Sequence, residues 1–277
     1  MPNPQTNHQL IRLNKFLAER LGVSRREADE LIAAGKITVD NQPASLGNKI
    51  DNKSKVCYNN KTIPFANEYT YLAFNKPVGY VCSRRAQGSA PTIYELLPKK
   101  YQHLKTVGRL DKDSSGLILL TNDGDFAYQM THPKFRKEKI YEVELDHPLE
   151  PLHQQMISDY GVMLDDGPSK FLVVRKEEPD ILSGAFRSAA ARELARSPRG
   201  DRPLGRGRPL VDGRERRGAG KDGQSPLYTA VLTEGRNRQI RRTFAALGYR
   251  VTKLHRTSFG KYQLGNLETG SYQEFKK

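Results

Sequence analysis

The spacing of apolar residues predicts two short helices at the start of the chain. Leucine and phenylalanine recur at helical spacing over residues 11–21, and Gly22 is expected to end that helix. Ser24 and Glu27 have the spacing of a capping box, in which each side chain accepts a hydrogen bond from the other residue's backbone. A second helix is therefore expected to follow Ser24 and to stop at Gly35.

The pattern changes to short β-rich runs after the helix pair. Residues 37–39 and 55–58 are rich in strand-forming side chains, and turn-prone residues separate them. We therefore expect a compact N-terminal module over residues 10–65 that combines two helices with strands. The polar residues 1–9 before it are expected to be disordered.

A second domain is expected over residues 68–277, and in it strands outnumber helices. A β-like run at 69–74 is expected to break at 75–79 and to resume through 80–82. Further strands are expected at 104–107, 116–121, 139–145, 170–175, 227–232 and 249–254, and helices at 125–131, 150–159 and 236–247. Because the strands do not alternate strictly with helices, we expect an α+β domain with a mainly antiparallel mixed sheet rather than a doubly wound one.

Residues 184–223 depart from both patterns. They hold 10 arginines, 8 glycines and 3 prolines among 40 positions, and almost no β-branched or aromatic residues. Such a stretch cannot bury enough apolar surface to offset the entropy lost on ordering, so we expect a disordered insertion. Its 11 basic and 5 acidic residues give a charge of +6. Two interpretations remain open, an arginine- and glycine-rich tether that attracts RNA and a solvated loop without a specific role.

The charge of the whole chain indicates a polyanionic partner. The 277 residues carry 46 lysines and arginines against 31 acidic residues, a formal charge of +15, and the isoelectric point is near 9.7. Nucleic acid or an anionic membrane surface would suit this charge. We expect no membrane contact, because no apolar run approaches the roughly 18–20 residues that span a bilayer. The polar start also lacks a signal-peptide core, so the protein is expected to be soluble and cytoplasmic.

Few residues suit a metal or redox site. Cys57 and Cys82 are the only cysteines, which is too few for a disulfide framework, and they lack the CxxC spacing of a zinc or redox site. The six histidines are scattered along the sequence. We therefore expect no metal ion.

The N-terminal module carries basic residues near the ends of its expected helices, namely Arg12, Lys15, Arg25 and Arg26. Such side chains neutralise backbone phosphates, and a helix N-terminus presents free N–H groups, so this helix pair suits RNA contact. Many solvated helix faces carry the same charges, which is the alternative interpretation. The pattern over residues 11–45, however, resembles the S4 RNA-binding domain. The similar runs are Arg12-Leu13-Asn14-Lys15-Phe16-Leu17, Ser24-Arg25-Arg26-Glu27-Ala28 and Gly35-Lys36-Ile37-Thr38-Val39.

The stretch GRLDKDSSGLILLTNDGDFA at residues 108–127 holds the strongest candidates for chemistry. Asp111 lies between two expected strands, so its carboxylate is carried on a loop fixed by rigid elements, a common place for catalytic groups. Taken alone, Asp111 and Asp113 are equally explained as turn residues, and residues 122–125 as a turn or a helix cap. The local pattern leaves these interpretations open.

Four motifs in the second domain resemble those of the RsuA/RluB-type pseudouridine synthases, in that family's order. They are Asn75-Lys76-Pro77-Val78-Gly79; Gly108-Arg109-Leu110-Asp111 with Gly116-Leu117 and Leu120-Thr121-Asn122-Asp123-Gly124; Lys139-Ile140-Tyr141-Glu142-Val143; and Glu234-Gly235-Arg236-Asn237-Arg238-Gln239-Ile240-Arg241-Arg242. The resemblance covers residues 11–183 and 224–277. It implies isomerisation of a uridine in ribosomal RNA, in which the N-glycosidic bond breaks, the uracil turns, and a carbon–carbon bond forms to the same ribose.

By the same resemblance, three residues carry the reaction. Asp111 would be the catalytic carboxylate and Arg241 its ion partner, since a guanidinium favours the charged form and keeps the pKa of a carboxylate low. Tyr141 would stack on the target base and assist proton removal at carbon 5. Alternation along residues 139–145 puts Tyr141 on the packed face of its strand, so a core tyrosine is the alternative interpretation.

Further arginines are candidates for RNA contact. The apolar residues of 236–247 form one buried helical face, which leaves Arg236, Arg238 and Arg242 for phosphates. Ordinary solvent-facing charge is the alternative. Arg109 is a candidate for RNA contact or for support of the loop.

The expected partner is ribosomal RNA or a ribosomal assembly intermediate, with the protein as a monomer. The sequence of residues 108–114 resembles that of the family branch that acts on large-subunit RNA, and a small-subunit target is the alternative. No cofactor is expected, because no electrons or groups leave the substrate. A non-catalytic RNA-binding or ribosome-assembly factor is a second hypothesis. Asp111, Tyr141 and Arg241 are all present, which argues against an enzyme that has lost its reaction. A hydrolase that uses Asp111 and Asp113 is a third, and it lacks a second carboxylate with a clear acid role.

Overall fold

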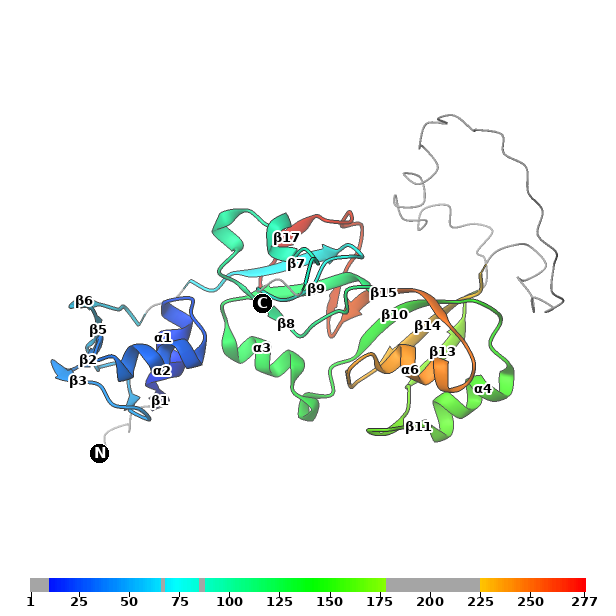
Figure 1. Ribbon diagram of the computed structural model, residues 1–277, viewed down its shortest axis with the longest axis horizontal. Helices are drawn as coiled ribbons and strands as arrows, with labels where there is room; N and C mark the ends of the chain where they lie inside the picture. The colour runs from blue at the N-terminus through cyan, green and yellow to red at the C-terminus, as the bar shows by residue number, and fades with distance from the viewer. Residues whose placement is uncertain (1–9, 66–67, 85–87, 178–224) are drawn as a thin grey trace, which may run out of the picture.

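The computed structural model describes residues 10–65, 68–84, 88–177 and 225–277 (Figure 1). The segments expected to be disordered, 1–9 and 184–223, lie outside the described residues. The N-terminal module lies at one end of the molecule, beside helix α3 (Gly124–Thr131), and the second domain extends away from it (Figure 1).

The N-terminal module contains the two expected helices and six short strands. They are β1 (Ile11–Arg12), α1 (Leu13–Arg20), α2 (Arg25–Ala33), β2 (Ile37–Val39), β3 (Gln42–Pro43), β4 (Lys49–Ile50), β5 (Val56–Tyr58) and β6 (Lys61–Thr62). Strands β3-β2-β5-β6 form one antiparallel sheet, and β1 pairs with β4. The expected capping box is confirmed, because the Ser24 hydroxyl accepts from the Glu27 N–H at 3.1 Å and the Glu27 carboxylate accepts from the Ser24 N–H at 2.6 Å.

The module has its own apolar core. Leu13, Phe16 and Leu17 of α1 are buried together with Ala28 and Ile32 of α2. Strand residues complete this cluster, so the helix pair covers the strands that follow it in sequence. Helices of this length gain most of their stability from such packing rather than from intrinsic propensity.

A nine-stranded sheet forms the centre of the second domain. Its strands are β7 (Tyr71–Lys76), β8 (Lys105–Val107), β9 (Ser115–Thr121), β10 (Lys139–Leu145), β13 (Val173–Lys176), β14 (Leu227–Leu232), β15 (Val251–Phe259), β16 (Tyr262–Gln263) and β17 (Tyr272–Glu274). The other elements are α3, α4 (Pro151–Gln155), α6 (Gln239–Ala246), the short helical turns η1 (Ile93–Leu96), η2 (Lys99–Tyr101), η3 (Pro133–Phe135) and η4 (Met156–Tyr160), and the hairpin β11 (Val162–Leu164) to β12 (Gly167–Ser169).

The sheet is mixed and mainly antiparallel, as expected for an α+β fold. Its order is β13-β14-β10-β15-β9-β7-β17, with β16 beside β15 and β8 beside β9. Among the described strand pairs, β9 with β15 is parallel and the others are antiparallel. Within the described ranges, no helix combines the length and the apolar character that crossing a bilayer requires.

Several element boundaries differ from the sequence expectation. Residues 80–82 form only an isolated bridge at Val81, and the strands expected at 170–175 and 249–254 begin later, at Val173 and Val251.

Two further differences have a clear physical cause. Strand β7 continues through Asn75 and Lys76, where a break was expected, because both side chains are buried and have backbone partners. Helix α6 begins at Gln239 rather than at residue 236. Arg238 takes a left-handed backbone conformation with φ of 46°, which is incompatible with a right-handed helix.

A close backbone approach joins the two halves of the sheet. Gly116 of β9 lies opposite Arg256 of β15 in the parallel pair. A Cβ atom at Gly116 would lie 2.3 Å from the carbonyl oxygen of Arg256, and Gly116 has φ of +103°. Only glycine meets both conditions without strain.

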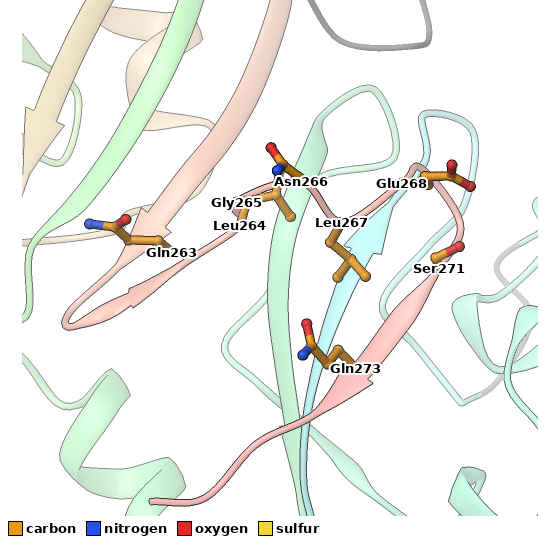
Figure 2. A pocket seen from close by; sticks show the side chains of 8 residues that line it. All are labelled: Gln263, Leu264, Gly265, Asn266, Leu267, Glu268, Ser271 and Gln273. Carbon is orange, nitrogen blue, oxygen red and sulfur yellow. The ribbon is translucent and has the colours of Figure 1, made fainter. Parts of the chain in front are cut away.

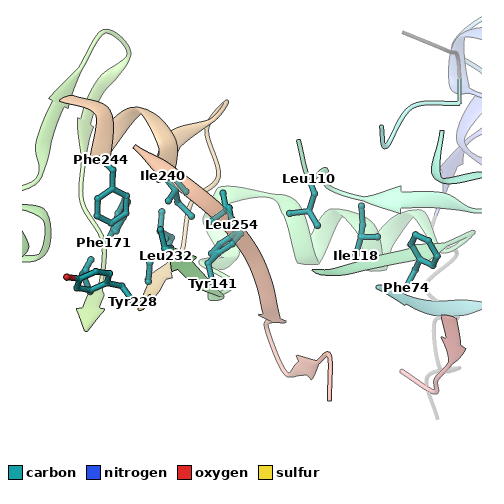
Figure 3. Close-up of a cluster of buried hydrophobic side chains, with 14 of the residues drawn as sticks. Phe74, Leu110, Ile118, Tyr141, Phe171, Tyr228, Leu232, Ile240, Phe244 and Leu254 are labelled. Carbon is teal, nitrogen blue, oxygen red and sulfur yellow. The ribbon is translucent and has the colours of Figure 1, made fainter. Parts of the chain in front are cut away.

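One apolar cluster continues from the first half of the sheet to the second (Figure 3). In α6, Ile240 and Phe244 face this cluster, and the Phe244 ring packs edge-on against Phe171 with ring centroids 6.0 Å apart. Leu110, which precedes Asp111, is buried in the same cluster. The core therefore holds both α6 and the loop before β9.

Three contacts join segments that are distant in the sequence. The Glu177 N–H donates to the Leu227 carbonyl at 2.9 Å, which closes the β13–β14 pair on either side of residues 178–224. Lys15 of the N-terminal module forms an ion pair with Asp125 of α3 at 2.5 Å, and Lys105 donates to the Val23 carbonyl at 2.7 Å.

Candidate active site

Asp111 lies on the loop between β8 and β9, and a buried lysine supports this loop. The Lys76 ammonium donates to the carbonyls of Ser114 at 2.6 Å, Pro77 at 2.9 Å and Lys112 at 3.5 Å. Lys76 is fully buried. Burial lowers the pKa of Lys76 to about 8, although the neighbouring acidic groups oppose this shift. The ammonium thus satisfies carbonyls that would otherwise lack donors in the interior.

The start of α6 brings two guanidinium groups to the loop. Arg238 donates to both oxygens of Asp113, at 2.9 Å each. The Arg241 Nε lies 3.3 Å from the Asp113 Oδ2, and its Nη2 donates to the Asp113 backbone carbonyl at 2.8 Å. The Arg241 Nη1 donates to the Val251 carbonyl at the start of β15, at 2.9 Å. Arg241 therefore connects the loop, α6 and β15.

The ion pair expected between Asp111 and Arg241 is replaced by one between Asp113 and Arg241. The guanidinium closest to Asp111 belongs to Arg238, with Nη1 4.0 Å from Oδ2. The two carboxylates are two positions apart on one loop and compete for the same two arginines. Asp113 takes the bidentate geometry with Arg238, which is the stronger arrangement.

The pKa values in this cluster reflect that competition. Burial tends to raise the pKa of Asp113, but the hydrogen bonds from Arg238 and the charges of both arginines outweigh it and lower the pKa. The hydrogen bond to Asp113 raises the pKa of Arg238, whereas burial lowers that of Arg241. The Asp111 side chain is 33% exposed and the Arg241 side chain 13% exposed, so Asp111 is the more open of the two to an approaching molecule.

Tyr141 lies on the packed face of β10, as its alternation predicts. It is 9% exposed and belongs to the same core cluster as Leu110 (Figure 3). The structure therefore brings the strand of Tyr141 and the loop of Asp111 onto one core. The interpretation of Tyr141 as a core residue agrees with this burial, and its expected role at a base stays a prediction.

Two buried cationic groups near this core were not identified as site residues from the sequence. Lys76 was recognised only as part of a motif, and Arg256 was not singled out. Arg256 is 2% exposed, its Nε donates to the Leu117 carbonyl at 2.8 Å, and its guanidinium lies 6.0 Å from the Tyr141 ring centroid. Neither group had a clear sequence signal, since Lys76 follows Asn75 at the end of YLAFNK and Arg256 lies among the polar residues of VTKLHRTSF.

The arginines expected to contact RNA fall into two groups. Arg236 and Arg242 both form ion pairs with Asp166 of the β11–β12 hairpin, at 2.9 and 2.8 Å. Arg238 pairs with Asp113. The charges of these three are therefore largely compensated within the protein, which the sequence spacing did not reveal.

The remaining candidates differ in exposure. Arg12, Arg25, Arg26 and Arg109 are exposed, whereas Lys15 is half-buried in its ion pair with Asp125. Burial of Lys15 follows from its position at the contact between the two domains. The exposed arginines thus remain the candidates with free charge for RNA contact.

A shallow hollow of about 490 Å³ lies elsewhere in the domain, between β16 and β17 (Figure 2). It is lined by Gln263, Leu264, Gly265, Asn266, Leu267, Glu268, Ser271 and Gln273. It shares no lining residue with the Asp111 loop or with α6. In the part of the chain that the structure describes, no group of three or more histidine, cysteine or acidic side chains could hold a metal ion.

Two family models match the chain. The family model described as RNA pseudouridylate synthase matches residues 70–246, and the S4 domain model matches residues 11–51. A solved structure described as a pseudouridylate synthase is similar in fold, with a TM-score of 0.57 at 27% identity over 96% of both chains.

Two curated relatives match almost the whole chain. The ribosomal small subunit pseudouridine synthase A of Pasteurella multocida is 31% identical over 95% of each chain. The ribosomal large subunit pseudouridine synthase B of Pseudomonas aeruginosa is also 31% identical, over 98% of this chain and 61% of that protein. The chain therefore spans less than two thirds of the second relative.

Proposed function

The chain belongs to the RNA pseudouridylate synthase family, and on that premise we propose that it converts uridine to pseudouridine in ribosomal RNA with Asp111 as the catalytic carboxylate. The observation that carries this assignment is that the two carboxylates of the loop have different ion-pair partners. Asp113 is engaged by Arg238 and Arg241, whereas Asp111 has one ion pair, at 4.0 Å, although the Asp113 side chain is the more exposed of the two, at 44% against 33%. Asp111 is thus the carboxylate with acceptor positions left for a nucleotide.

In the proposed reaction the Asp111 carboxylate attacks the ribose C1′ as a nucleophile, and the bond from C1′ to the uracil N1 breaks. The uracil turns, C5 bonds to C1′, and the bond between Asp111 and C1′ breaks, which returns the carboxylate. The proton on C5 leaves and N1 gains a proton, so product and substrate have the same composition. The attack needs an ionised carboxylate, and the guanidiniums of Arg238 and Arg241 lie beside the loop that carries it.

Tyr141 is proposed to meet the uracil ring and to assist removal of the C5 proton. Its position on the core shared with Leu110 supports this role. Offset or edge-on contact between a base and an aromatic ring is tolerant of sequence, so Tyr141 would orient the base without reading it. Arg241 would hold the loop in register with β15 through its bonds to Asp113 and Val251.

The target uridine must leave its stack to meet Asp111. Extrusion of a base costs a few kcal/mol, which contacts to RNA phosphates offset. Arg12, Arg25, Arg26 and Arg109 are exposed and suit these contacts. Recognition of sequence would use loops and splayed bases, because the major groove of an RNA duplex is too narrow to read.

The ribosomal subunit is the finer part of the proposal. The names of the relatives include both small-subunit and large-subunit enzymes. We favour large-subunit RNA because of the amino-acid sequence of residues 108–114. We also infer a cytoplasmic monomer that acts on ribosomal RNA or an assembly intermediate. Mapping pseudouridines in both ribosomal RNAs, from cells with and without the protein, would identify the subunit. A missing pseudouridine in small-subunit RNA alone would contradict the large-subunit choice.

The role of Asp111 is tested by the Asp111→Asn variant. It should bind RNA normally and lose pseudouridine formation by on the order of 10⁴-fold or more, because the amide cannot act as a nucleophile. Asp165→Asn is the matched control, since it removes an exposed carboxylate from the β11–β12 turn. Wild-type modification by Asp111→Asn would refute the assignment.

The alternative functions make different predictions. A non-catalytic RNA-binding factor would form no pseudouridine even as the wild-type protein on ribosomal RNA. A hydrolase would release free uracil, and it would need a second carboxylate that carries a proton. The lowered pKa of Asp113 argues against that role, because Asp113 stays ionised.

A further inference from the structure

The loop and the start of α6 hold two carboxylates and two guanidiniums whose formal charges cancel. Asp113 receives both hydrogen bonds of the Arg238 fork at 2.9 Å, and its Oδ2 lies 3.3 Å from the Arg241 Nε. Asp111 has a single ion pair, at 4.0 Å from Arg238. The two carboxylates are therefore unequal in their contacts, although they share one loop.

Arg241 does not depend on the Asp113 side chain for its position. Two backbone carbonyls, those of Asp113 and Val251, accept from its Nη atoms at 2.8 and 2.9 Å. Arg238 is different, because Asp113 accepts both of its hydrogen bonds and Asp111 is its other carboxylate neighbour. Loss of the Asp113 charge would leave Arg238 with Asp111 as its nearest counter-ion.

We propose that Asp113 is a positioning residue that holds Arg238 away from Asp111 and so keeps the Asp111 oxygens free for the nucleotide. The inference rests on the proposed role of Asp111. Asp113 touches neither the substrate nor the reacting atoms in this scheme. It acts through Arg238, whose Nη1 stays 4.0 Å from the Asp111 Oδ2 and leaves the Asp111 oxygens unoccupied.

The physical reason is the geometry of the arginine fork. A guanidinium that binds a carboxylate bidentately engages both oxygens, so each oxygen has fewer free lone pairs and less negative charge with which to attack. At 4.0 Å the same charge still acts through its field and makes no hydrogen bond. Asp113 thus keeps the charge of Arg238 near Asp111 while it prevents Arg238 from hydrogen bonding to the Asp111 oxygens.

The test is a double-mutant cycle on positions 113 and 238, with single-turnover pseudouridine formation as the readout. Asp113→Asn should lower the rate constant on the order of 10²-fold, because Arg238 moves onto the reacting group. Affinity for the RNA should change little.

The double variant distinguishes positioning from a merely structural role. Removal of the released guanidinium by Arg238→Gln in the Asp113→Asn background should restore part of the lost rate. A structural role predicts that the double variant is as slow as the single variant or slower. No recovery of rate in the double variant, or a wild-type rate in Asp113→Asn, would overturn the proposal.

A second pair of variants covers the case in which Asp113→Asn fails to fold. Asp113→Glu and Asp113→Gln have the same length and differ in charge. The glutamate should retain most of the rate and the glutamine should not, and equal losses would overturn the inference. Failure of the proposed function is distinguishable, because Asp111→Asn would then modify RNA normally whatever the variants at position 113 do.

Discussion

The backbone of Gly116 in β9 lies against the backbone of Arg256 in β15 so closely that a Cβ at Gly116 would be 2.3 Å from the Arg256 carbonyl oxygen. This contact lies where the parallel strand pair joins the two halves of the sheet. The strand that leaves the Asp111 loop and the strand that binds Arg241 therefore meet at one glycine.

Gly116→Ala should destabilise the protein by about 3 kcal/mol, because the new methyl group meets backbone atoms and the φ of +103° is strained for alanine. Chemical denaturation would measure the loss. Gly79→Ala is the matched control, since Gly79 has φ of +95° and no heavy atom within 4 Å of its Cβ position. Equal losses for the two variants would show that strain alone, without the clash, accounts for the effect.

His255 lies in the same strand pair and should make the stability of the protein depend on pH in the acidic range. Its Nδ1 and the Ser115 hydroxyl are 2.8 Å apart, and burial, with a smaller effect of Lys253, lowers the pKa of His255 to about 4. Between pH 6.5 and 4 the unfolded chain binds a proton that the folded protein does not, so stability falls as the pH falls through this window. The contribution is about 3 kcal/mol at most.

The effect is measured as the difference in unfolding free energy between wild type and His255→Gln as a function of pH. That difference should change between pH 6.5 and 4 and be flat above pH 7. His103→Gln, at an exposed histidine, serves as the control and should show no such change. A flat difference for His255→Gln would rule out the neutral buried form.

Lys76 should make the stability of the protein depend on pH in the alkaline range. The pKa of Lys76 is lowered by burial to about 8, against an unfolded value near 10.5. Between these values the unfolded chain binds the extra proton, so stability rises with pH across this window, by about 3 kcal/mol at most. The difference between wild type and Lys76→Met should grow in favour of wild type from pH 8 to 10.5.

Lys112→Met provides the comparison, because the Lys112 side chain is exposed on the same loop. The two variants should also differ in activity. Loss of the ammonium under the loop removes the donor to the Ser114 and Pro77 carbonyls, while the Lys112 carbonyl keeps the Gly79 N–H. This loss should slow pseudouridine formation, whereas Lys112→Met should not. Similar rates for both variants would mean that the loop holds its shape without Lys76.

The arginines should contribute unequally to RNA binding. Arg26 is exposed, whereas Arg242 is paired with Asp166 at 2.8 Å. If Arg26 contacts one phosphate, Arg26→Ala should reduce the slope of log affinity against log salt by about 0.7. Arg242→Ala should leave that slope nearly unchanged. A larger change for Arg242 would indicate that RNA displaces Asp166.

Long elements with a clear period were predictable from the sequence. Strands at 139–145 and 227–232 have the expected bounds, because apolar and polar residues alternate along them between a core and a less buried face. The capping box at Ser24 was predictable for a local reason, since its two partners are three positions apart. Two-residue strands such as β1 and β4 were not, because pairing across the fold defines them.

The pairing of charges in the site was beyond the reach of sequence patterns. The motif gave both Asp111 and Arg241, but the choice of Asp113 as the partner depends on where Arg238 points at the left-handed turn before α6. Differences of about an ångström decide such contacts. The ion pairs of Asp166 with Arg236 and Arg242 have the same origin, since a hairpin distant in sequence supplies the carboxylate.

The hydrogen bond between Glu177 and Leu227 fixes the two points at which the chain leaves and re-enters the sheet. These points are neighbours on the β13–β14 pair, at the opposite end of the strand order from β7 and β17. The length of the connection between them can consequently vary in evolution or in the laboratory without shifting Asp111, Tyr141 or Arg241. A fluorescent probe or an affinity handle spliced in at this junction would report on RNA capture while leaving the chemistry untouched.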